Sequence, residues 1–506
     1  MSDFSIGSPD AKVNIIEYAS FTCQHCANFH ATTYPQLKAD YIDTGKIRFE
    51  YREVYFDRYG LWAAMIARCG GEMRYFGITD LIFEQQSEWA ASEDPTTVVE
   101  NLKKIGRTAG LDDAAVSAIS LIDEHGERRV RMANLAFAGS HSINGVAALH
   151  TELMKQTVFA DLHALYPDRI NNKTNGVTPR RWLQQCNPRL TGLIREAIGD
   201  GFLDDAEKLE ALADHADDAA FGDRIDAVKR ANKVDLAQHL TDLTGIQLDP
   251  DAMFDVQVKR IHEYKRQLLN LLETVALYDQ IRSHPERDWA PRVKIFGGKA
   301  ASSYHNAKLI IKLANDVARR VNGDPAVGDL LKVVFVPNYN VSLAERIIPA
   351  ADLSEQISTA GMEASGTGNM KFALNGALTI GTLDGANIEI LERVGADNMF
   401  IFGLTAEEVS AKRNAGYDPR SVIEGSSELA QAVHSIASGV FSPDDPSRFA
   451  DLMGGLMSSD WFMLAADFDA YAAAQRSVDD SWRDSRAWRE SAIRNIANLG
   501  SAKAAR

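Results

Sequence analysis

The sequence is poor in cysteine, with four among 506 residues, and two of these, Cys69 and Cys186, stand alone. A small secreted domain stapled by disulfides needs a paired set of cysteines, so that class of protein is excluded. Long apolar runs are missing as well, and none approaches the length that crosses a membrane. Because Met1 to Phe4 lacks a basic region followed by a hydrophobic stretch, we expect no secretory signal and a cytoplasmic location.

Basic residues are outnumbered, with 54 lysines and arginines against 70 aspartates and glutamates and a formal net charge of −16. This balance argues against nucleic acid and anionic membranes as partners, although phosphate binding depends only on local charge. Internal repeats and low-complexity segments are also absent. The 45% hydrophobic content is sufficient for buried cores, and the length predicts two to four domains.

The most informative segment that is present runs from Glu363 to Lys371 and reads EASGTGNMK. A glycine-rich turn that leads into a helix directs free backbone N–H groups at a ligand, which favours an anion. A lysine in a desolvated pocket beside such a turn can form a Schiff base with an aldehyde. The alternative is an ordinary turn followed by a solvated lysine. A Walker motif is excluded, because Phe372 follows the lysine where Ser or Thr is required.

A second group of charged residues lies between Lys259 and Arg266, in the run KRIHEYKR. If the run is helical, Arg260 and Tyr264 share a face, and Lys259 and Lys265 flank it. The alternative is an exposed basic helix without a ligand.

Between residues 292 and 402 the pattern alternates between strands and helices. We expect strands at 293–296, 332–336, 377–381 and 398–402, and helices at 306–321 and 343–348. This alternation predicts an α/β fold with a doubly wound parallel sheet, in which ligands bind beyond the carboxyl ends of the strands. Gly297 to Lys299 and Pro337 to Asn340 follow two of these strands, where a ligand loop is expected.

Five long runs resemble the glycogen and maltodextrin (α-glucan) phosphorylases, in the order found in that family. They are 139–150, 172–182, 254–267, 348–361 and 361–389. The resemblance covers about residues 120–500 and implies the second half of such an enzyme, with the C-terminal domain of a GT-B glycosyltransferase. It implies a remnant of the N-terminal domain at 120–165, a domain that binds pyridoxal phosphate at 166–500, and an unmatched tail at 501–506.

The resemblance also implies roles for individual residues. Lys371 matches the lysine that carries pyridoxal 5′-phosphate, and Lys259, Arg260 and Lys265 match residues that handle the cofactor phosphate and the substrate phosphate. The residues matching the sugar site are Asn175, Tyr264, Glu363, Ala364, Ser365 and Gly366. Those matching the remaining phosphate and cofactor contacts are Thr367, Gly368, Trp182 and Tyr339. Asn340 stands where some family members carry arginine.

The reaction that the resemblance implies is retaining phosphorolysis of a terminal α-1,4-linked glucose to glucose 1-phosphate. The implied substrates are inorganic phosphate and an α-1,4-glucan such as glycogen or maltodextrin, with no metal ion and with a homodimer as the assembly. The N-terminal half of the family's cleft has no match before about residue 120, so we expect little turnover. His141 and His150 are not the sugar-binding histidine of that half.

The first part of the chain has a different pattern. Val13 to Tyr18 and Ile47 to Tyr51 read as strands, and Cys23-Gln24-His25-Cys26 opens an amphipathic run after the first of them. A C-x-x-C motif that opens a helix after a strand is typical of thioredoxin-type redox sites, where the helix N-terminus stabilises a thiolate. The alternative is half of a zinc knuckle. With a helix beginning at Trp62, residues 1–119 resemble the DsbA-like thiol-disulfide oxidoreductases, which insert a helical domain into a thioredoxin fold.

This thioredoxin-type part is expected to be incomplete. The family closes its fold with two further strands, a helix and a cis-proline loop, but no proline occurs between Pro95 and Pro167. We therefore expect an open sheet edge.

Two functional alternatives to the phosphorylase hypothesis follow. One is a thiol-disulfide oxidoreductase acting through Cys23 and Cys26, and the other is a fusion of two fragments without function.

Overall fold

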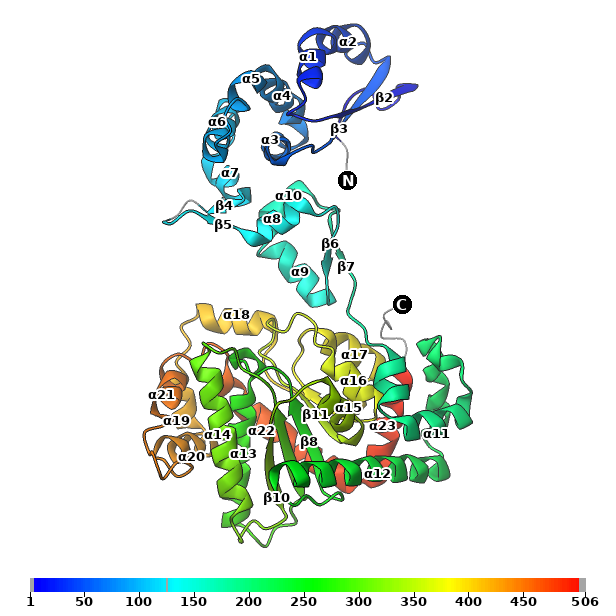
Figure 1. The fold of residues 1–506 in the computed structure, drawn as a ribbon, viewed down its shortest axis with the longest axis vertical. Helices are drawn as coiled ribbons and strands as arrows, with labels where there is room; N and C mark the ends of the chain where they lie inside the picture. Colours follow the sequence, from blue (N-terminus) through cyan, green and yellow to red (C-terminus); the bar gives the residue numbers. More distant parts are fainter. Residues whose placement is uncertain (1–3, 124–125, 500–506) are drawn as a thin grey trace. The chain divides into compact units, whose positions relative to one another are not determined.

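The structure is a computed structural model that describes residues 4–123 and 126–499. Its residues pack into two compact units, which we describe separately (Figure 1). Unit 1 comprises Met1–Gly145 and Thr151–Asn172, and unit 2 comprises Val146–His150 and Lys173–Arg506. The tail predicted at 501–506 lies outside the described residues, and the domain boundaries drawn from the sequence stay predictions.

Unit 1 contains a three-stranded mixed sheet in the order β1-β3-β2. The strands are β1 (Ser5–Gly7), β2 (Val13–Ala19) and β3 (Ile47–Glu53), with β2 parallel and β1 antiparallel to β3. Helix α1 (Gln24–Thr32) begins within the cysteine motif, directly after Cys23, and its Ala27 is buried in one apolar cluster with Phe49 and Tyr51 of β3. The strand and helix positions expected around the cysteine motif are confirmed.

Helices follow this sheet without an intervening strand up to residue 119. They are α3 (Arg58–Cys69), α4 (Gly71–Glu84), α5 (Gln86–Trp89), α6 (Pro95–Thr108) and α7 (Asp113–Ile119). Two short elements, α2 (Tyr34–Leu37) and the π-helix η1 (Lys38–Ile42), precede β3. The helical insertion into a thioredoxin-like sheet is thus confirmed.

Strand β2 forms the open edge that the sequence predicts. In the described part of unit 1 it pairs only with β3. Val13, Ile16 and Tyr18 are 52%, 39% and 63% exposed. An unpaired strand with exposed apolar side chains is a template for pairing with another chain. Unit 1 therefore carries an aggregation-prone edge.

The segment between 120 and 172, apart from Val146–His150, packs against the helices of unit 1. Its elements are β4 (Ile122–Asp123), β5 (Arg129–Val130), α8 (Met132–Gly139), β6 (Ile143–Gly145), α9 (Ala148–Gln156), α10 (Ala160–Leu165) and β7 (Ile170–Asn172). Phe137 and Leu162 share an apolar cluster with Met65 and Ile119. This cluster joins the segment to α3 and α7.

Unit 2 is built on a six-stranded sheet in the order β10-β9-β8-β11-β12-β13, with every pairing parallel. The strands are β8 (Met253–Val258), β9 (Arg292–Gly297), β10 (Leu331–Val336), β11 (Leu353–Gln356), β12 (Leu378–Gly381) and β13 (Met399–Ile401). Most of them are buried along their whole length, which suits strands covered on both faces. The doubly wound parallel sheet predicted from the sequence is confirmed.

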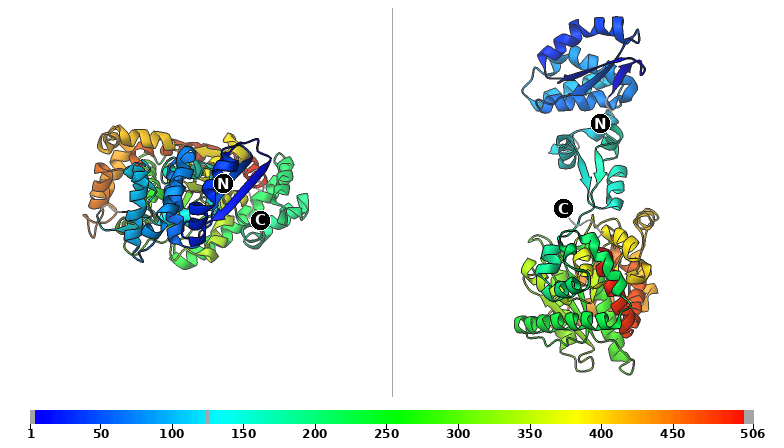
Figure 2. Two further views of the ribbon diagram at one scale, coloured as in Figure 1. Left: turned by 90° about the horizontal axis from the view of Figure 1, so that it is seen from above. Right: turned by 90° about the vertical axis from the view of Figure 1, so that its right-hand side faces the viewer.

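Helices cover both faces of this sheet (Figures 1 and 2). One layer includes α13 (Gln267–Ser283), α14 (His305–Asn322), α19 (Pro419–Gly425), α20 (Ser427–Ala437), α21 (Ala450–Ser458) and α22 (Leu464–Arg483). The other includes α11 (Pro188–Ile198), α12 (Ala219–Thr244), α15 (Val341–Ala350), α16 (Gly368–Leu374) and α23 (Ser485–Leu499), with η2 (Arg180–Gln185) and η4 (Ala206–His215). The remaining elements are η3 (Gly201–Leu203), η5 (Glu263–Lys265), α17 (Ala386–Val394), η6 (Ala396–Asn398) and α18 (Ala406–Asn414).

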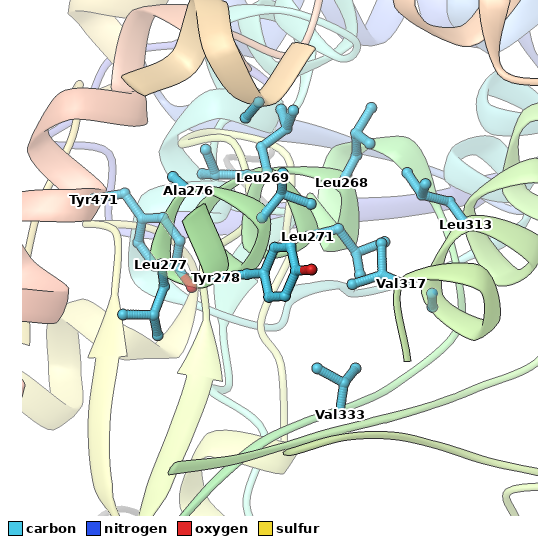
Figure 3. Packing of buried hydrophobic residues seen from close by; sticks show 14 of the residues in the cluster. Leu268, Leu269, Leu271, Ala276, Leu277, Tyr278, Leu313, Val317, Val333 and Tyr471 are labelled. Carbon is cyan, nitrogen blue, oxygen red and sulfur yellow. The ribbon is translucent and has the colours of Figure 1, made fainter. Parts of the chain in front are cut away.

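Side chains alternate along each strand between the two cores. Val333 of β10 packs with Leu271 of α13 and Val317 of α14 on one face, as Figure 3 shows. Its neighbour Val334 faces the other core, with Phe254 of β8. The two-sided burial holds the strand ends at fixed positions.

A buried ionic network joins the central strands of unit 2. Arg292 pairs with Asp255 at 2.9 Å and with Asp479 at 2.7 Å. Lys294 pairs with Asp255 at 3.1 Å and with Glu273 at 2.8 Å. These ion pairs connect β8 and β9 to the helices α13 and α22.

Glu355 of β11 lies in this network, where its charged form is disfavoured. Burial and the neighbouring Asp255 raise its pKa well above 4.5. Glu355 Oε2 and Asp255 Oδ1 are buried acceptors without another hydrogen-bond partner in the described structure, which fits one proton shared between them.

Replacing Glu355 with glutamine is expected to change stability little at about pH 4.5 and to raise it relative to the wild type at higher pH, because glutamine keeps the uncharged form that burial favours. In the wild type, a raised folded-state pKa gives stability below about pH 4.5 that is lost as the pH rises toward that pKa. Urea unfolding between pH 5 and 8, with exposed Glu286→Gln as control, should show this decline in the wild type and a flatter profile in E355Q. Identical pH profiles for both proteins would contradict the shared proton.

Candidate active site

The sheet of unit 2 has one switch point, between β8 and β11. From β8 the chain moves outward to β9 and β10, and then returns to the other side with β11, β12 and β13. In such sheets the crevice at the carboxyl ends of the two switch strands binds ligands. Lys259 directly follows β8, and its Nζ donates to Oε1 of Gln356, the last residue of β11, at 2.8 Å. Lys259, which is predicted to bind phosphate, thus lies at the switch point.

The segment from Lys259 to Arg266 is not the helix considered from the sequence. Lys259 to His262 form a loop, η5 is a short 3-10 turn, and Arg266 has a left-handed backbone with φ of 56°. The buried strand β8 runs to Val258, so the chain leaves the sheet extended, and Arg266 is fixed by Ile357 O and Asp467. Arg260 and Tyr264 therefore do not share a helical face.

Lys265, Tyr264 and Glu363 meet at the mouth of this crevice. Lys265 forms an ion pair with Glu363, and its Nζ lies 4.6 Å from the centroid of the Tyr264 ring. Burial lowers the pKa of Lys259 to about 8, an effect that Glu363 opposes and Lys265 reinforces. Because Lys265 disfavours the charged form of Lys259, a phosphate bound near Lys259 would offset this repulsion and be stabilised in turn.

The glycine-rich segment forms the turn into a helix that its sequence predicts. Helix α16 begins at Gly368, after a turn in which Gly366 has φ of 75°. Thr367 occupies the N-cap but makes no side-chain capping hydrogen bond, so the amides of the first turn are not capped by it. A Cβ placed on Gly368 would lie 3.7 Å from Gln356 Nε2, which puts this turn beside the residue that holds Lys259.

Lys371 lies one turn into α16 and is half-buried. Its Nζ is 4.2 Å from the centroid of the Trp182 ring, and burial together with Arg181 lowers its pKa. Asn375 Nδ2 donates to the carbonyl oxygens of both Trp182 and Lys371, at 2.7 and 2.9 Å. Tyr339 packs against the same apolar cluster as Trp182. An amine with a lowered pKa, beside a ring that can stack on a flat cofactor, fits attachment of an aldehyde.

For the other predicted site residues, the structure gives fewer contacts with the lysines of the site. Asn175 is held through its backbone N–H, which donates to Val146 O at 3.0 Å. Ser365 is buried, whereas Ala364 and Arg260 are exposed. Among the described residues, no side-chain contact joins Arg260 to the lysines of the site. Its predicted role in phosphate binding stays a prediction.

Sequence reasoning missed three residues that support the site. Gln356 holds Lys259, Asn375 fixes the end of the Lys371 helix, and Asp384 accepts hydrogen bonds from the backbone of the Glu363 loop. The only local signal was the Asp384-Gly385 turn dipeptide. Their partners lie far away in the sequence, so no spacing rule identifies them.

The cysteine motif in unit 1 has a defined geometry. Cys23 is the N-cap of α1, and its Sγ accepts a hydrogen bond from Cys26 N at 3.3 Å. Burial and the contact with Cys23 raise the pKa of Cys26 to about 11. Within the described ranges, no cluster of three or more His, Cys, Asp or Glu side chains is arranged to bind a metal ion. The two thiols therefore differ, because Cys23 caps the helix N-terminus and the thiol of Cys26 is hard to ionise.

Across residues 4–123 and 126–499, no helix combines the length and apolar character that crossing a membrane requires.

Comparison with known proteins agrees with both parts of this description. Residues 97–506 match the family described as carbohydrate phosphorylase, and residues 1–149 match the family described as thioredoxin. A glycogen phosphorylase from Synechocystis sp. is 53% identical over 389 residues, which cover 77% of this chain and 46% of the relative. The glycogen phosphorylase of Haemophilus influenzae is 51% identical over 389 residues, which cover 77% of this chain and 47% of the relative.

The brain form of glycogen phosphorylase from Mus musculus is 52% identical over 382 residues, which cover 76% of this chain and 45% of that protein. The chain spans about half the length of the curated relatives it matches. The matched region contains the whole six-stranded sheet and the segment from Glu363 to Lys371. The chain therefore belongs to the carbohydrate phosphorylase family and carries a thioredoxin-family domain in its first part.

Proposed function

We propose that unit 2 binds pyridoxal 5′-phosphate through Lys371 and forms the cofactor-holding side of an α-glucan phosphorylase site. The observation that carries this proposal is the environment of Lys371, whose amine has a lowered pKa and lies over the Trp182 ring. An uncharged amine attacks an aldehyde, so a lowered pKa favours Schiff-base attachment at neutral pH. The helix that carries Lys371 begins beside Gln356, which also orients Lys259.

The other residues of the crevice bind and orient in this proposal. Lys259 and Lys265, with Arg260, offset the charge of the phosphates, and Thr367 and Gly368 supply a hydroxyl and amide donors. Glu363 accepts hydrogen bonds from sugar hydroxyls, supported by the sugar-site residues Asn175, Tyr264, Ala364, Ser365 and Gly366. Trp182 and Tyr339 flank the cofactor. When bound, the cofactor supplies a phosphate that exchanges a proton with inorganic phosphate.

The reaction we assign to this site is phosphorolysis of a terminal α-1,4-linked glucose, with glycogen or maltodextrin and inorganic phosphate as substrates. A homodimer in the cytoplasm is part of the same proposal. Because the curated relatives contain about as much sequence again as the matched part, we propose that turnover by this chain alone is low. Cofactor binding is thus the property to test first.

Replacing Lys371 with alanine is expected to abolish the Schiff-base absorbance that the wild-type chain acquires from pyridoxal 5′-phosphate. The matched control is Lys208→Ala, which removes an exposed amine on η4. The control should keep the full absorbance, measured per chain after removal of free cofactor. Equal absorbance in the Lys371→Ala protein would show that another amine holds the cofactor.

A second candidate function is thiol-disulfide exchange at Cys23 and Cys26. The observation that favours it is the placement of Cys23 as the cap of α1, where its Sγ accepts a hydrogen bond from Cys26 N. In this proposal Cys23 attacks the disulfide of a substrate and forms a mixed disulfide with the release of one substrate thiol. Cys26 then attacks the sulfur of Cys23 in the mixed disulfide and releases the second substrate thiol. A Cys23–Cys26 disulfide forms, so both electrons pass from the two cysteines to the substrate.

Replacing Cys23 with serine is expected to remove insulin-reduction activity in the presence of dithiothreitol, because the attacking sulfur is lost. Cys69→Ser is the control, since burial raises the pKa of Cys69 to about 12 and makes it a poor nucleophile. The control should retain activity. Insulin-reduction activity in the Cys23→Ser protein equal to that of the wild type would contradict this second function.

A fusion without function is the third hypothesis. The open edge of β2 favours association of unit 1, and size-exclusion chromatography with limited proteolysis distinguishes a folded chain from an aggregating one.

A further inference from the structure

Asp384 is a buried carboxylate beside the candidate sugar site. It lies in the turn between β12 and α17, and it is 1% exposed. Its two oxygens accept four hydrogen bonds, which come from two backbone amides, one hydroxyl and one imidazole. The donors are Gly361 N at 3.0 Å, Glu363 N at 2.8 Å, Ser358 Oγ at 2.9 Å and His150 Nε2 at 2.9 Å. Asp384 therefore fixes the backbone on both sides of Met362, immediately before the Glu363 side chain.

The residue after Asp384 fits against the same loop. Gly385 has φ of 52°, and a Cβ on it would lie 2.4 Å from Ser365 O and 2.6 Å from Glu363 O. Ala386 N donates to Ser365 O at 2.7 Å. The turn at residues 384–386 thus supports the loop from Gly361 to Ser365 along its length.

His150 brings a distant segment to this support. It belongs to the stretch Val146–His150, which packs within unit 2, and its side chain is 13% exposed. In the same stretch, Val146 O accepts the hydrogen bond from Asn175 N at 3.0 Å. One segment of five residues therefore contacts both the turn that holds Glu363 and the backbone of Asn175.

We propose that Asp384, oriented by His150, is a positioning residue that sets the sugar-binding geometry of Glu363, and that Val146–His150 aligns Glu363 with Asn175. This inference rests on the proposed function and specifies which groups organise its sugar site. Neither Asp384 nor His150 contacts the sugar in this proposal, since each acts through the loop that carries Glu363.

Asp384 acts on the loop through its hydrogen bonds, and a side chain of the same volume with fewer acceptors would not replace it. Only a side chain with two acceptor oxygens can receive the amides of both Gly361 and Glu363 while it also accepts from Ser358 and His150. In Asp384→Asn, an NH₂ group replaces one of these oxygens and faces a donor. One backbone amide of the loop then loses its acceptor, so the loop relaxes although the volume of the side chain is unchanged.

The test uses the full chain loaded with pyridoxal 5′-phosphate and glucose 1-phosphate as the probe. Calorimetric titration gives the dissociation constant, absorbance gives cofactor per chain, and amide hydrogen exchange reports the peptide that contains Gly361 and Glu363. For Asp384→Asn and His150→Ala we expect about tenfold weaker glucose 1-phosphate binding and faster exchange in that peptide. Cofactor per chain should be unchanged.

Two further variants sharpen this result. His150→Gln keeps a donor near the position of Nε2 and should restore binding to within about threefold of wild type. His141→Ala removes an exposed histidine of unit 1 and should change nothing. A purely structural role for His150 would instead lower cofactor content and sugar affinity together in both His150 variants.

The inference is overturned if Asp384→Asn and His150→Ala bind glucose 1-phosphate as wild type does, or if exchange in the Gly361 to Glu363 peptide is unchanged. It is also overturned if the wild type holds the cofactor but does not bind the sugar phosphate. A wild type that takes up no cofactor contradicts the proposed function instead, and the exchange measurement then still decides whether Asp384 and His150 order the loop.

Discussion

Replacing Arg292 with methionine is expected to lower the free energy of unfolding of unit 2 by about 3–5 kcal/mol. The guanidinium is 1% exposed and pairs with Asp255 on β8 and Asp479 on α22. Methionine would leave these two carboxylates buried with less compensation, and an uncompensated buried charge costs far more than an ion pair gains. Arg292 lies on β9, so its loss loosens the strands whose carboxyl ends form the candidate site.

Tryptophan fluorescence during urea unfolding measures this effect, because five of the seven tryptophans, at 182, 289, 461, 482 and 488, lie in unit 2. The control is Arg224→Met on α12, whose partner Glu196 is 64% exposed, and it should cost less than about 1 kcal/mol. Equal and small losses for both variants would mean that the buried network does not hold the sheet together.

The second large effect is expected at Lys259. Replacing it with methionine should weaken binding of pyridoxine 5′-phosphate at pH 7 by about 10- to 100-fold, the size of one charge-assisted hydrogen bond. This probe carries the phosphate but no aldehyde, so it tests the phosphate site independently of Lys371. Lys312→Met, which removes a lysine on α14 that is paired with Asp316, is the control and should bind as wild type does.

The pH dependence of the wild type follows from the same lysine. Burial lowers the pKa of Lys259 to about 8, and a bound phosphate would raise it again by favouring the charged amine. Affinity should therefore be constant below about pH 8 and fall as the pH rises above it, by up to tenfold per unit. Calorimetry across pH 6.5 to 9.5 should show this decline in the wild type but not in K259M. A decline of the same size in both would assign the titration to another group.

Four of the six strands of the parallel sheet, β9, β10, β12 and β13, could be predicted because short apolar runs alternate with helical patterns there. The switch strands β8 and β11 were not among the expected strands, because buried polar and charged side chains such as Asp255 and Glu355 interrupt their apolar pattern. The turn before α16 followed from its glycines, and the open edge of β2 followed from the absence of closing strands. The helical conformation considered for the segment after Lys259 was wrong. Charge spacing suits either a helix or a loop there, and the burial of β8 and Arg266 decides between them.

The supporting residues could not be predicted for a different reason. Gln356, Asn375 and Asp384 act through contacts that connect parts of the chain 97, 193 and 234 residues apart. Such contacts depend on the order of strands in the sheet, which the local pattern of residues does not encode.

Peptide mapping of the borohydride-reduced protein tests the central claim most directly. The wild-type chain is incubated with pyridoxal 5′-phosphate, freed of unbound cofactor, reduced, digested and sequenced by mass spectrometry. We predict one phosphopyridoxyl group per chain, attached to Lys371. A modification spread over exposed lysines, or a single modification at another lysine, would contradict the assignment of Lys371 as the cofactor-binding residue.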